Sequence, residues 1–331
     1  METSIMKAIA YTNYGPPEVL KPIELAKPVP KPDEVLVRIH ATSVTAGDYR
    51  ARSLDMPPGF GLVGRLVFGL CHPRRQLLGT EFAGVIEAVG EQVTRFKTGD
   101  RIIAYPGARF GGYAEYAVIH QDAAIVPAPD NLALDEAVAL SFGGSTALHF
   151  LRNMANIKPG DAVLIIGAAG GVGNAAVQLA KHFGAHVTGV ASTEKLDMVR
   201  SLGADAVLDY SHEDAASATD AYDIILDTSG TATYAKYGAA LKPGGRLLLV
   251  SANLWQLLGT LFARKTGSRE AMGGYAPERA EDLRLLADLA SDGRFKPYID
   301  RQFPLNQAAD AHAWFKNPAR KGNVVIVTDA A

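Results

Sequence analysis

The sequence contains a single cysteine, Cys71, among its 331 residues. One thiol excludes an internal disulfide and every metal site that needs two thiolates, including a four-cysteine structural zinc site. It also favours a reducing, cytoplasmic setting. An excess of charge is absent as well, because 33 basic and 35 acidic side chains give a formal net charge of -2. The chain therefore lacks the basic footprint of a nucleic-acid-binding protein.

Long hydrophobic runs are also missing. No stretch approaches the roughly 18 uninterrupted apolar residues that a membrane-spanning helix needs, and we expect no signal peptide. Two shorter runs, Gly59–Leu70 and Leu254–Ala263, are each followed closely by two basic residues. These basic residues are Arg74 with Arg75 and Arg264 with Lys265. We favour a buried helix or a subunit contact for each run, with contact to a membrane surface as the alternative.

Proline is scarce in the middle of the chain. Of the 18 prolines, 12 precede residue 130, and only Pro159 and Pro243 lie between residues 130 and 267. Because proline is confined to edges, turns and strand starts, the first third is predicted to be irregular and rich in strands. Turn-rich segments separate most of the strands that we predict there. These strands span Lys7–Ala10, Glu34–Ser43, Gly84–Val89, Arg101–Ala104 and Tyr113–Ile119.

The middle of the chain alternates strands with helices, a pattern typical of a doubly wound parallel sheet of the α/β class. The first strand, Ala162–Ile166, is wholly apolar, as expected for a parallel strand covered on both faces. Further strands are predicted at His186–Val190, Ala206–Asp209, Asp223–Asp227 and Arg246–Val250, and helices at Asn174–Phe183, Glu194–Leu202 and Tyr234–Leu241. The tail adds helices over Pro277–Ser291 and Asn306–Phe315 and a strand over Val324–Val327.

A glycine-rich turn follows the apolar strand and opens the first helix of this sheet. Its spacing, Ala168-x-Gly170-x-x-Gly173, is a variant of the dinucleotide-binding fingerprint with alanine in place of the first glycine. Such a turn brings the backbone close to a pyrophosphate, and the helix N-terminus favours its negative charge. We predict dinucleotide binding, against the alternative of a turn without a ligand. The residues of the turn are Ala168, Gly170, Gly171, Val172 and Gly173.

The end of the next strand indicates which dinucleotide is bound. A site that prefers NADH carries an acidic residue there, bonded to the ribose 2′-hydroxyl, but this sequence has Ala191. Ser192, Thr193 and Lys195 offer hydroxyl donors and a cation to the 2′-phosphate of NADPH. Glu194 is an acidic residue that would favour NADH, but it comes too late in the sequence to reach the ribose 2′-hydroxyl. The alternative for Lys195 is a solvent-exposed position in the first turn of the helix. We predict NADPH in preference to NADH.

Several further segments occur in an order known from one family. They are Leu78–Gly90, Thr98–Arg101, Gly111–Tyr116, Gly167–Gly173, Leu202–Asp205, Leu241–Arg246 and Lys321–Val325. Over essentially its whole length the chain resembles the medium-chain dehydrogenase/reductase superfamily, and most of all its zinc-free, quinone-oxidoreductase branch. The resemblance implies a GroES-like, partly open β-barrel domain over residues 1–128, completed by residues 268–331. A Rossmann NAD(P)-binding domain would span residues 129–267, with the active cleft between the two domains.

The resemblance also implies a homodimer formed through edge strands of the Rossmann sheets. Arg246–Val250 and Leu254–Ala263 are the candidate contacts.

The zinc members of this family bind a catalytic zinc with a cysteine, a histidine beside a glutamate, and a third ligand. Here Thr45 stands at the cysteine position and Thr80 at the histidine position. The segment Ser141–Ser145 offers neither cysteine nor histidine as the third ligand. Because hydroxyls are poor zinc ligands, we expect no catalytic zinc and no other metal. Glu81, which follows Thr80, would then be free to pair with an arginine.

The family's substrate pocket falls near Thr45. The candidate catalytic residues are Thr45, Asp48, Tyr49 and Arg52. Tyr49 could donate a hydrogen bond or a proton, or stack on a flat acceptor, and Asp48 could orient Tyr49 or the nicotinamide ribose. The alternatives are a helix cap for Asp48, packing for Tyr49 and a surface ion pair for Arg52.

Other site residues are carried over from their positions in the family. Phe110 and Phe142 are candidate apolar walls of the substrate pocket, with a place in the core as the alternative. Strand ends and one helix start supply the remaining candidate cofactor contacts, because ligands bind at the strand ends of such sheets. These contacts are Thr146, Tyr210, Ser229, Gly230 and Ser251.

Without a Lewis acid, alcohol oxidation loses its main electrostatic aid. A zinc-free cleft suits an acceptor whose reduced form delocalises charge, such as a quinone or an α,β-unsaturated carbonyl. Together with the resemblance, this predicts an NADPH-dependent oxidoreductase that acts on such small molecules. The alternatives are an alcohol dehydrogenase-like enzyme for small alcohols or aldehydes, and a non-catalytic NADPH-binding sensor or structural protein.

Overall fold

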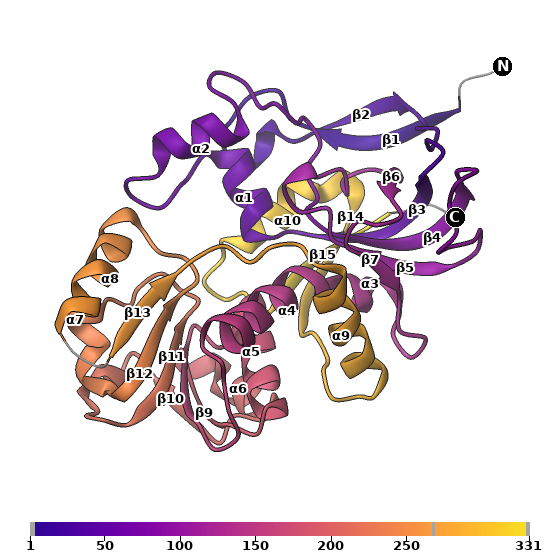
Figure 1. The fold of residues 1–331 in the computed structure, drawn as a ribbon. Helices are drawn as coiled ribbons and strands as arrows, with labels where there is room; N and C mark the ends of the chain where they lie inside the picture. The colour runs from indigo at the N-terminus through magenta and orange to yellow at the C-terminus, as the bar shows by residue number, and fades with distance from the viewer. Residues whose placement is uncertain (1–3, 267–268, 329–331) are drawn as a thin grey trace.

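The computed structural model describes residues 4–266 and 269–328. Figure 1 shows two lobes side by side, one from the middle of the chain and one from its two end regions. The long sheet of the second lobe places strands from both end regions next to each other, which is the arrangement that a returning C-terminal segment produces.

The middle lobe contains the predicted parallel sheet, with six strands in the order β10-β9-β8-β11-β12-β13. The strands are β8 (Ala162–Ile166), β9 (His186–Ala191), β10 (Ala206–Asp209), β11 (Tyr222–Asp227), β12 (Leu241–Leu249) and β13 (Glu270–Gly273). Its helices include α5 (Gly171–His182), α6 (Leu196–Ser201), α7 (Tyr234–Tyr237) and α8 (Leu254–Thr266). The doubly wound α/β prediction is therefore confirmed, and the apolar run of β8 lies in the buried centre of the sheet.

The edge of this sheet differs from the prediction in two respects. Strand β13 lies beyond residue 267, where we placed the end of the nucleotide-binding domain, so the sheet extends to Gly273. Arg246–Val250 is not an edge, because β12 is paired with β11 on one side and β13 on the other. The sequence of β13 gave no signal for a strand, since its four residues follow no apolar pattern. The outer strands among those described are β10 and β13.

The other lobe is built on a seven-stranded sheet in the order β14-β15-β3-β4-β5-β7, with β6 also paired to β3. A separate hairpin joins β1 (Ile5–Ala10) to β2 (Lys21–Ala26). The seven strands are β3 (Glu34–Ser43), β4 (Phe82–Val89), β5 (Arg101–Ala104), β6 (Tyr116–His120), β7 (Ile125–Pro127), β14 (Ile299–Pro304) and β15 (Asn323–Val327). Because β15 is antiparallel to β3, the end of the chain completes the sheet that its beginning starts.

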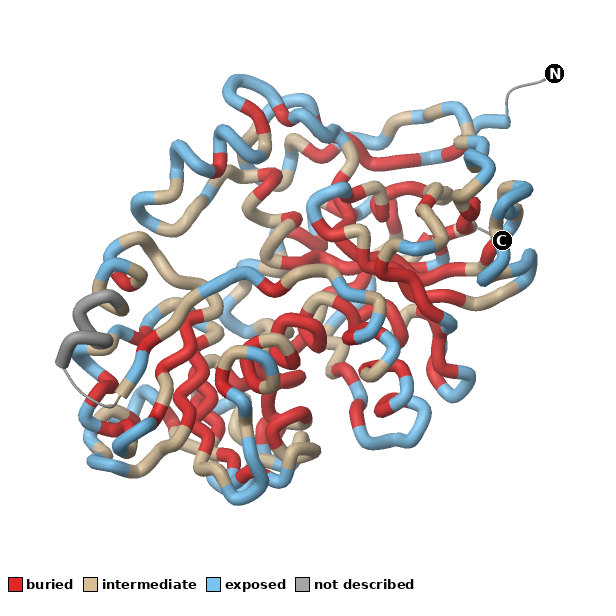
Figure 2. Tube along the Cα trace, viewed as in Figure 1, coloured by how far each residue is buried: buried red, intermediate tan, exposed pale blue. Residues whose placement is uncertain are grey.

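Helix α2 (Gly61–Phe68) contradicts one half of the favoured prediction for the first apolar run, burial within the chain, and leaves the other half, a subunit contact, as a prediction. That prediction was a buried helix or a subunit contact, but the leucines and valines of α2 are exposed in this chain (Figure 2). The second run forms most of α8, and the side chains of its basic residues Arg264 and Lys265 lie outside the described part of the chain. Within that part, no helix has the length and apolarity needed to cross a bilayer.

The two lobes share a hydrophobic core. One cluster of buried side chains includes Ala41 and Ile103 of the seven-stranded sheet together with Val163 and Ile165 of β8. The linking helices include α3 (Leu134–Ala137), α4 (Ser141–Leu148) and α9 (Ala280–Ser291), while α10 (Ala308–Phe315) packs on β14 and β15. Because apolar packing is continuous between the lobes, it stabilises their relative position.

Candidate active site

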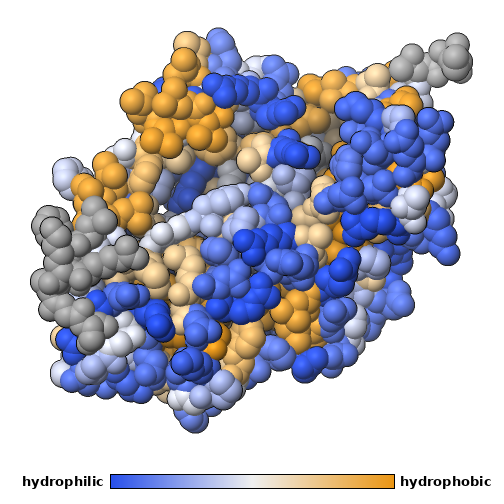
Figure 3. Space-filling view, in the orientation of Figure 1, coloured by the Kyte–Doolittle hydropathy of each residue, from blue (hydrophilic) through white to orange (hydrophobic). Residues whose placement is uncertain are grey.

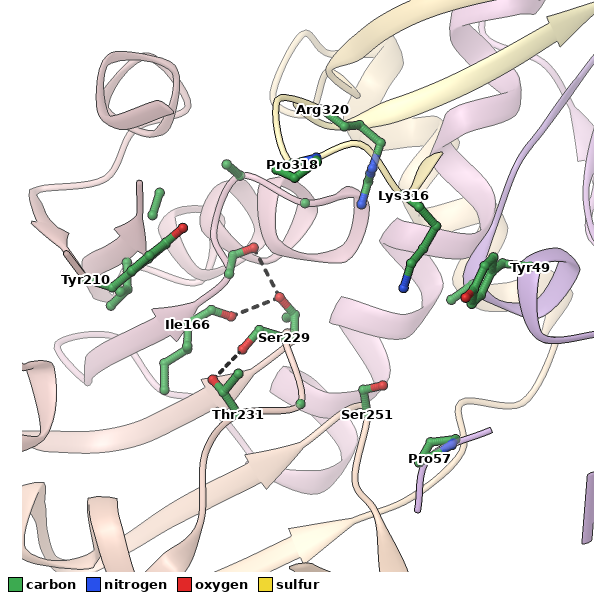
Figure 4. A pocket seen from close by; sticks show the side chains of 18 of the residues that line it. Tyr49, Pro57, Ile166, Tyr210, Ser229, Thr231, Ser251, Lys316, Pro318 and Arg320 are labelled. Atoms are coloured by element: carbon green, nitrogen blue, oxygen red, sulfur yellow. Dashed lines mark hydrogen bonds between the residues drawn. The ribbon is translucent and has the colours of Figure 1, made fainter. Parts of the chain in front are cut away.

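A cleft of about 910 Å³ lies where the two lobes face each other. On the parallel-sheet side it is lined by residues at or after the carboxyl ends of strands, among them Ile166, Ala191 and Thr228. On the other side it is lined by α1 (Ala46–Ser53), the segment after α1 and the loop after α10. This is the crevice in which ligands bind in open α/β sheets. Figure 4 shows side chains from both sides directed into this cavity.

The glycine-rich turn after β8 has the geometry of a phosphate cradle. A Cβ on Gly173 would lie 2.1 Å from the carbonyl oxygen of Gly167, so this position must be glycine. Gly170 is the N-cap of α5, and no side chain caps the helix there. The unpaired N–H groups of the first helical turn are therefore available to an anion. This chain's backbone fits the pyrophosphate of a dinucleotide.

The structure brings about half of the predicted site residues to the cleft. The residues that line it are Tyr49, Gly170, Ser192, Lys195, Tyr210, Ser229, Gly230 and Ser251. The remaining predicted residues are not among those that line it: Thr45, Asp48, Arg52, Phe110, Phe142, Thr146, Ala168, Gly171, Val172, Gly173 and Thr193. Ala168 and Gly171 to Gly173 can still contribute to the cofactor site, because they shape the backbone of the turn and need no side chain in the cavity for this.

Lys195 and Arg320 lie at the end of the cleft where β9 finishes. The Lys195 ammonium donates to the carbonyl oxygen of Pro318 at 2.6 Å, and burial lowers the pKa of Lys195. Arg320 follows in the same loop and points into the cavity (Figure 4). Gly322 N donates to Ala169 O at 2.7 Å, which holds this loop against the glycine-rich turn.

The cleft is basic. Five lysines and arginines line it, and Asp55 is the only acidic side chain among its lining residues. One of these cations, Lys195, was predicted from the sequence, and the other four were not. The five cations are Arg50, Lys195, Lys236, Lys316 and Arg320. The basic run around Lys316 and Arg320 is visible in the sequence, but its position over the glycine-rich turn depends on the return of the chain.

Two hydroxyl residues at strand ends are held by aspartates of the parallel sheet. Ser229 donates to Asp227 at 2.7 Å, and the same carboxylate accepts the backbone N–H groups of Ser229 and Gly230. This arrangement fixes the turn after β11 inside the cleft. Thr193 instead donates to Asp209, and it is not among the residues that line the cavity.

Tyr49 faces the cleft from α1. Its hydroxyl donates to Asp55 at 2.5 Å, and its ring stacks on Phe315 with 5.9 Å between the centroids. The Lys316 ammonium lies 4.7 Å from the centre of the Tyr49 ring, and Figure 4 shows both side chains on the same side of the cavity. The carboxylate that orients Tyr49 is thus Asp55, where we had suggested Asp48.

Thr45, Asp48 and Thr80 form a buried hydrogen-bonded network beside the cleft. Thr45 Oγ1 donates to Asp48 at 2.6 Å and lies 2.9 Å from Thr80 Oγ1. Asp48 also accepts the backbone N–H groups of Gly79 and Thr80 at 2.8 and 3.1 Å. The carboxylate therefore caps α1 and ties it to the start of β4. The alternative that we gave for Asp48 was the helix N-cap, but the N-cap is Thr45, and Asp48 takes part in the cap from the N3 position of the capping box.

The chemistry of these side chains does not fit a zinc ion. The two hydroxyls at the cysteine and histidine positions, Thr45 and Thr80, are bonded to each other and to Asp48. Glu81 accepts from the Ser43 hydroxyl and from Phe142 N instead of pairing with an arginine. In the part of the chain that the structure describes, no three His, Cys, Asp or Glu side chains gather as metal ligands.

Arg52 and the two phenylalanines are packed away from the cavity. Arg52 is buried, where we had suggested a surface ion pair as the alternative, and its Nε donates to His312 at 3.2 Å. The Phe110 ring lies against Phe68, with 6.4 Å between the centroids. Phe142 packs against Tyr105 in the same way, at 6.3 Å.

Comparisons with known proteins agree with this geometry. The family model described as "Alcohol dehydrogenase GroES-like domain" matches residues 31–130, and that described as "Zinc-binding dehydrogenase" matches residues 202–326. The chain is 30% identical to the chloroplastic quinone-oxidoreductase homolog of Spinacia oleracea, over 98% of this chain and 99% of that protein. It is 32% identical to the 2-methylene-furan-3-one reductase of Solanum lycopersicum, over 98% of this chain and 79% of that protein.

A solved structure shows the same fold. The quinone oxidoreductase from Coxiella burnetii superimposes with a TM-score of 0.85 at 30% identity, covering 98% of this chain and 99% of that one. The fold and the cleft define a pyridine-nucleotide-dependent oxidoreductase that binds NAD(P)H. The chain belongs to the medium-chain dehydrogenase/reductase superfamily, in its quinone-oxidoreductase-like branch. The resemblance seen in the sequence is therefore confirmed.

Proposed function

We propose that this enzyme is an NADPH-dependent, zinc-independent reductase that transfers hydride to a quinone or an α,β-unsaturated carbonyl. The observation that carries the proposal is the composition of the cleft, where five cations and one carboxylate surround a glycine-rich phosphate cradle. The names of two relatives, a quinone-oxidoreductase homolog and a furanone reductase, support this class of acceptor.

The cofactor would lie across the carboxyl ends of the parallel strands. Gly170 and the N-terminus of α5 would bind the pyrophosphate, and Ser192, Lys195 and Arg320 would bind the 2′-phosphate. Candidate contacts along the rest of the cofactor are Tyr210, Ser229, Gly230 and Ser251. When bound, NADPH supplies the hydride from its nicotinamide ring.

We propose that the enzyme acts without zinc because the side chains at the family's zinc-ligand positions are poor ligands for this metal. The hydroxyls of Thr45 and Thr80 are poor zinc ligands, and both already bond to Asp48. Hydride transfer to a simple aldehyde leaves the charge on one alkoxide oxygen, which the zinc ion stabilises as a Lewis acid in the zinc-dependent members of the family. A conjugated acceptor spreads the developing charge over its own atoms, so ordinary hydrogen-bond donors and cations can stabilise it.

Tyr49 and Lys316 are the residues that we propose to face the acceptor. The Lys316 ammonium and the Tyr49 hydroxyl would stabilise the negative charge that develops on the acceptor oxygen. Asp55 holds the Tyr49 hydroxyl at 2.5 Å and thereby fixes the ring in the cleft. Because Tyr49 has a single O–H, it would turn this proton from Asp55 to the acceptor oxygen, and there donate a hydrogen bond or the proton itself.

The test follows oxidation of NADPH and NADH by chelator-treated protein with 1,4-quinones, enones, enals and simple aldehydes. We expect saturable turnover of the conjugated acceptors, faster with NADPH and unchanged by the chelator. Tyr49→Phe should lower kcat by about 10-fold or more, whereas Tyr234→Phe, outside the lining of the cleft, should not. If the protein bound NADPH tightly but reduced none of these acceptors, the reductase proposal would be wrong and a sensor or structural role would be favoured.

A further inference from the structure

Helix α2 presents an apolar face to solvent. Leu62, Leu66 and Val67 are 69%, 52% and 54% exposed, and Val63 lies beside them on the same face. Figure 3 shows this face as one hydrophobic surface at the tip of its lobe. Scattered exposed leucines are ordinary in soluble proteins, but a contiguous apolar patch marks an interaction site.

The opposite face of α2 packs against the rest of the chain, and this packing keeps the apolar face turned towards solvent. A Cβ on Gly64 would lie 2.6 Å from the Met56 side chain, which shows how closely the helix packs there. Phe68 packs on Phe110, and Tyr14 donates to the carbonyl oxygen of Gly69 at 2.8 Å. Because these contacts occupy the inner side of the helix, the leucines and valines cannot turn inward without breaking them.

The charged residues in α2 and on either side of it in the sequence, between Asp55 and Glu81, have one sign. Residues 56–80 contain three arginines and no aspartate or glutamate. The arginines, Arg65, Arg74 and Arg75, are all exposed. An apolar helix face bordered by cations is complementary to a bilayer surface that carries anionic headgroups. A symmetric contact with a second copy would instead bring like-charged arginines together, which opposes self-association through this face.

A second apolar element borders the same cleft. Trp255, near the start of α8, is 71% exposed, and tryptophan is favoured where one end of a side chain is apolar and the other is wet. Leu254 N donates to Pro58 O at 3.0 Å, so the segment before α2 and the start of α8 touch. Met56 and Gln256, from these same two segments, line the cleft. The apolar elements thus lie beside the cavity on both lobes (Figures 1 and 3).

We propose that a docking patch, formed by Leu62, Val63, Leu66, Val67 and Trp255, binds the enzyme to the surface of an anionic lipid bilayer. The patch would hold the cleft beside the membrane, so that a lipophilic acceptor can pass from the bilayer into the cleft. Only the passage of the acceptor rests on the proposed function; binding to lipid requires neither cofactor nor turnover.

The test measures flotation of the full-length protein with lipid vesicles, without cofactor or acceptor. We expect binding to vesicles of phosphatidylcholine with phosphatidylglycerol and much weaker binding to phosphatidylcholine alone. The double variant Leu66→Gln/Val67→Gln should bind at least about tenfold more weakly, because it removes apolar surface from the patch. The control Val29→Gln removes a valine that is even more exposed, at 84%, but lies between β2 and β3 outside the patch, and this variant should bind normally.

A charge variant and two further measurements complete the test. Arg74→Gln/Arg75→Gln should weaken binding to anionic vesicles and reduce its dependence on salt. Failure of the unaltered protein to float, or flotation that the patch variant does not change, would overturn the proposal. So would a shift from dimer to monomer in the patch variant by gel filtration, since a second copy would then cover the face. Turnover of a water-soluble quinone by the same variants reports separately on the proposed function.

Discussion

At the scale of single residues, the clearest test concerns the cations at the end of β9. Lys195 and Arg320 line the part of the cleft where the 2′-phosphate of NADPH would lie. We expect Lys195→Ala and Arg320→Ala each to raise the KM for NADPH about tenfold, because each removes a charge-assisted contact. The KM for NADH, which lacks the phosphate, should change little.

Steady-state kinetics with both cofactors checks this prediction. Arg200→Ala is the matched control, since Arg200 lies on α6 and pairs with Asp197 rather than lining the cleft. Equal losses for NADPH and NADH would show that the two cations bind another part of the cofactor.

Glu81 is a buried carboxyl with no cation bonded to it among its described contacts. Burial raises its pKa to about 8, from an ordinary value of 4.5. Between these two pH values the folded chain retains a proton that the unfolded chain has released. The free energy of unfolding should therefore fall as the pH rises from 4.5 to about 8, and this contribution should level off above that range.

The variant Glu81→Gln mimics the protonated side chain and should remove most of this pH dependence. We expect a difference of about 2 kcal/mol or more between variant and unaltered protein across this range, measured by urea unfolding. Glu194→Gln, at an exposed position, is the control. If the free energy of unfolding changed with pH in the same way in Glu81→Gln and in the unaltered protein, the raised pKa of Glu81 would be contradicted.

At the scale of elements, the turn between β8 and α5 tolerates no side chain at its last glycine. In Gly173→Ala the new Cβ would lie 2.1 Å from Gly167 O and 2.8 Å from Ala168 Cα, and both are backbone atoms. The turn must shift, which should cost about 1 to 3 kcal/mol of stability and weaken NADPH binding at least tenfold.

Urea unfolding and fluorescence titration with NADPH measure the two effects of Gly173→Ala. Gly61→Ala is the matched control, because a Cβ there meets nothing within 4 Å. If Gly173→Ala bound NADPH as tightly as Gly61→Ala, the turn would not be the pyrophosphate site.

The most accurate predictions from the sequence were for elements whose bounds are determined by neighbouring residues in the chain. The bounds of β3, β5, β8 and β10 match the prediction residue for residue, and the clearest case is β8, an apolar run that ends before Gly167. The strand β13 was missed because its four residues become a strand only beside β12. For α2, an apolar run predicted burial or a subunit contact, and burial within the chain was wrong because it depends on which faces the rest of the chain covers.

The candidate site residues also fall into those that local sequence predicts and those that depend on contacts between distant segments. The glycine-rich turn follows from its spacing, Ser192 and Lys195 follow from their distance along the chain after it, and Tyr210 follows from its position in the family. Arg320 lies 150 residues after Gly170 of the turn, and the pairing of Gly170 with Gly322 helps to bring it and Lys316 to the cleft. Asp55 was missed because its hydrogen bond to Tyr49 depends on the path of the segment after α1.

At the scale of the whole molecule, the cleft exists only when several distant segments are assembled. Its lining comes from residues near Tyr49, from the ends of β8, β9 and β11, and from the loop around Arg320. A continuous core that includes Ala41 and Val163 fixes the two lobes against each other. The unfolded chain therefore offers no comparable site, and a ligand of the cleft should bind the folded state alone.

Exclusive binding to the folded state predicts thermal stabilisation by the cofactor. At a concentration 100 times its Kd, NADPH should add about 2.7 kcal/mol to the free energy of unfolding. For a chain of this length that corresponds to a rise in Tm of roughly 4 to 6 °C, measured by differential scanning calorimetry. At the same concentration NADH should raise Tm less, and Arg320→Ala should reduce the NADPH shift towards the NADH shift, because Lys195 would still contact the 2′-phosphate. Equal shifts for the two cofactors in the unaltered protein would show that the basic loop around Arg320 does not select NADPH, because the 2′-phosphate is the only group that distinguishes them.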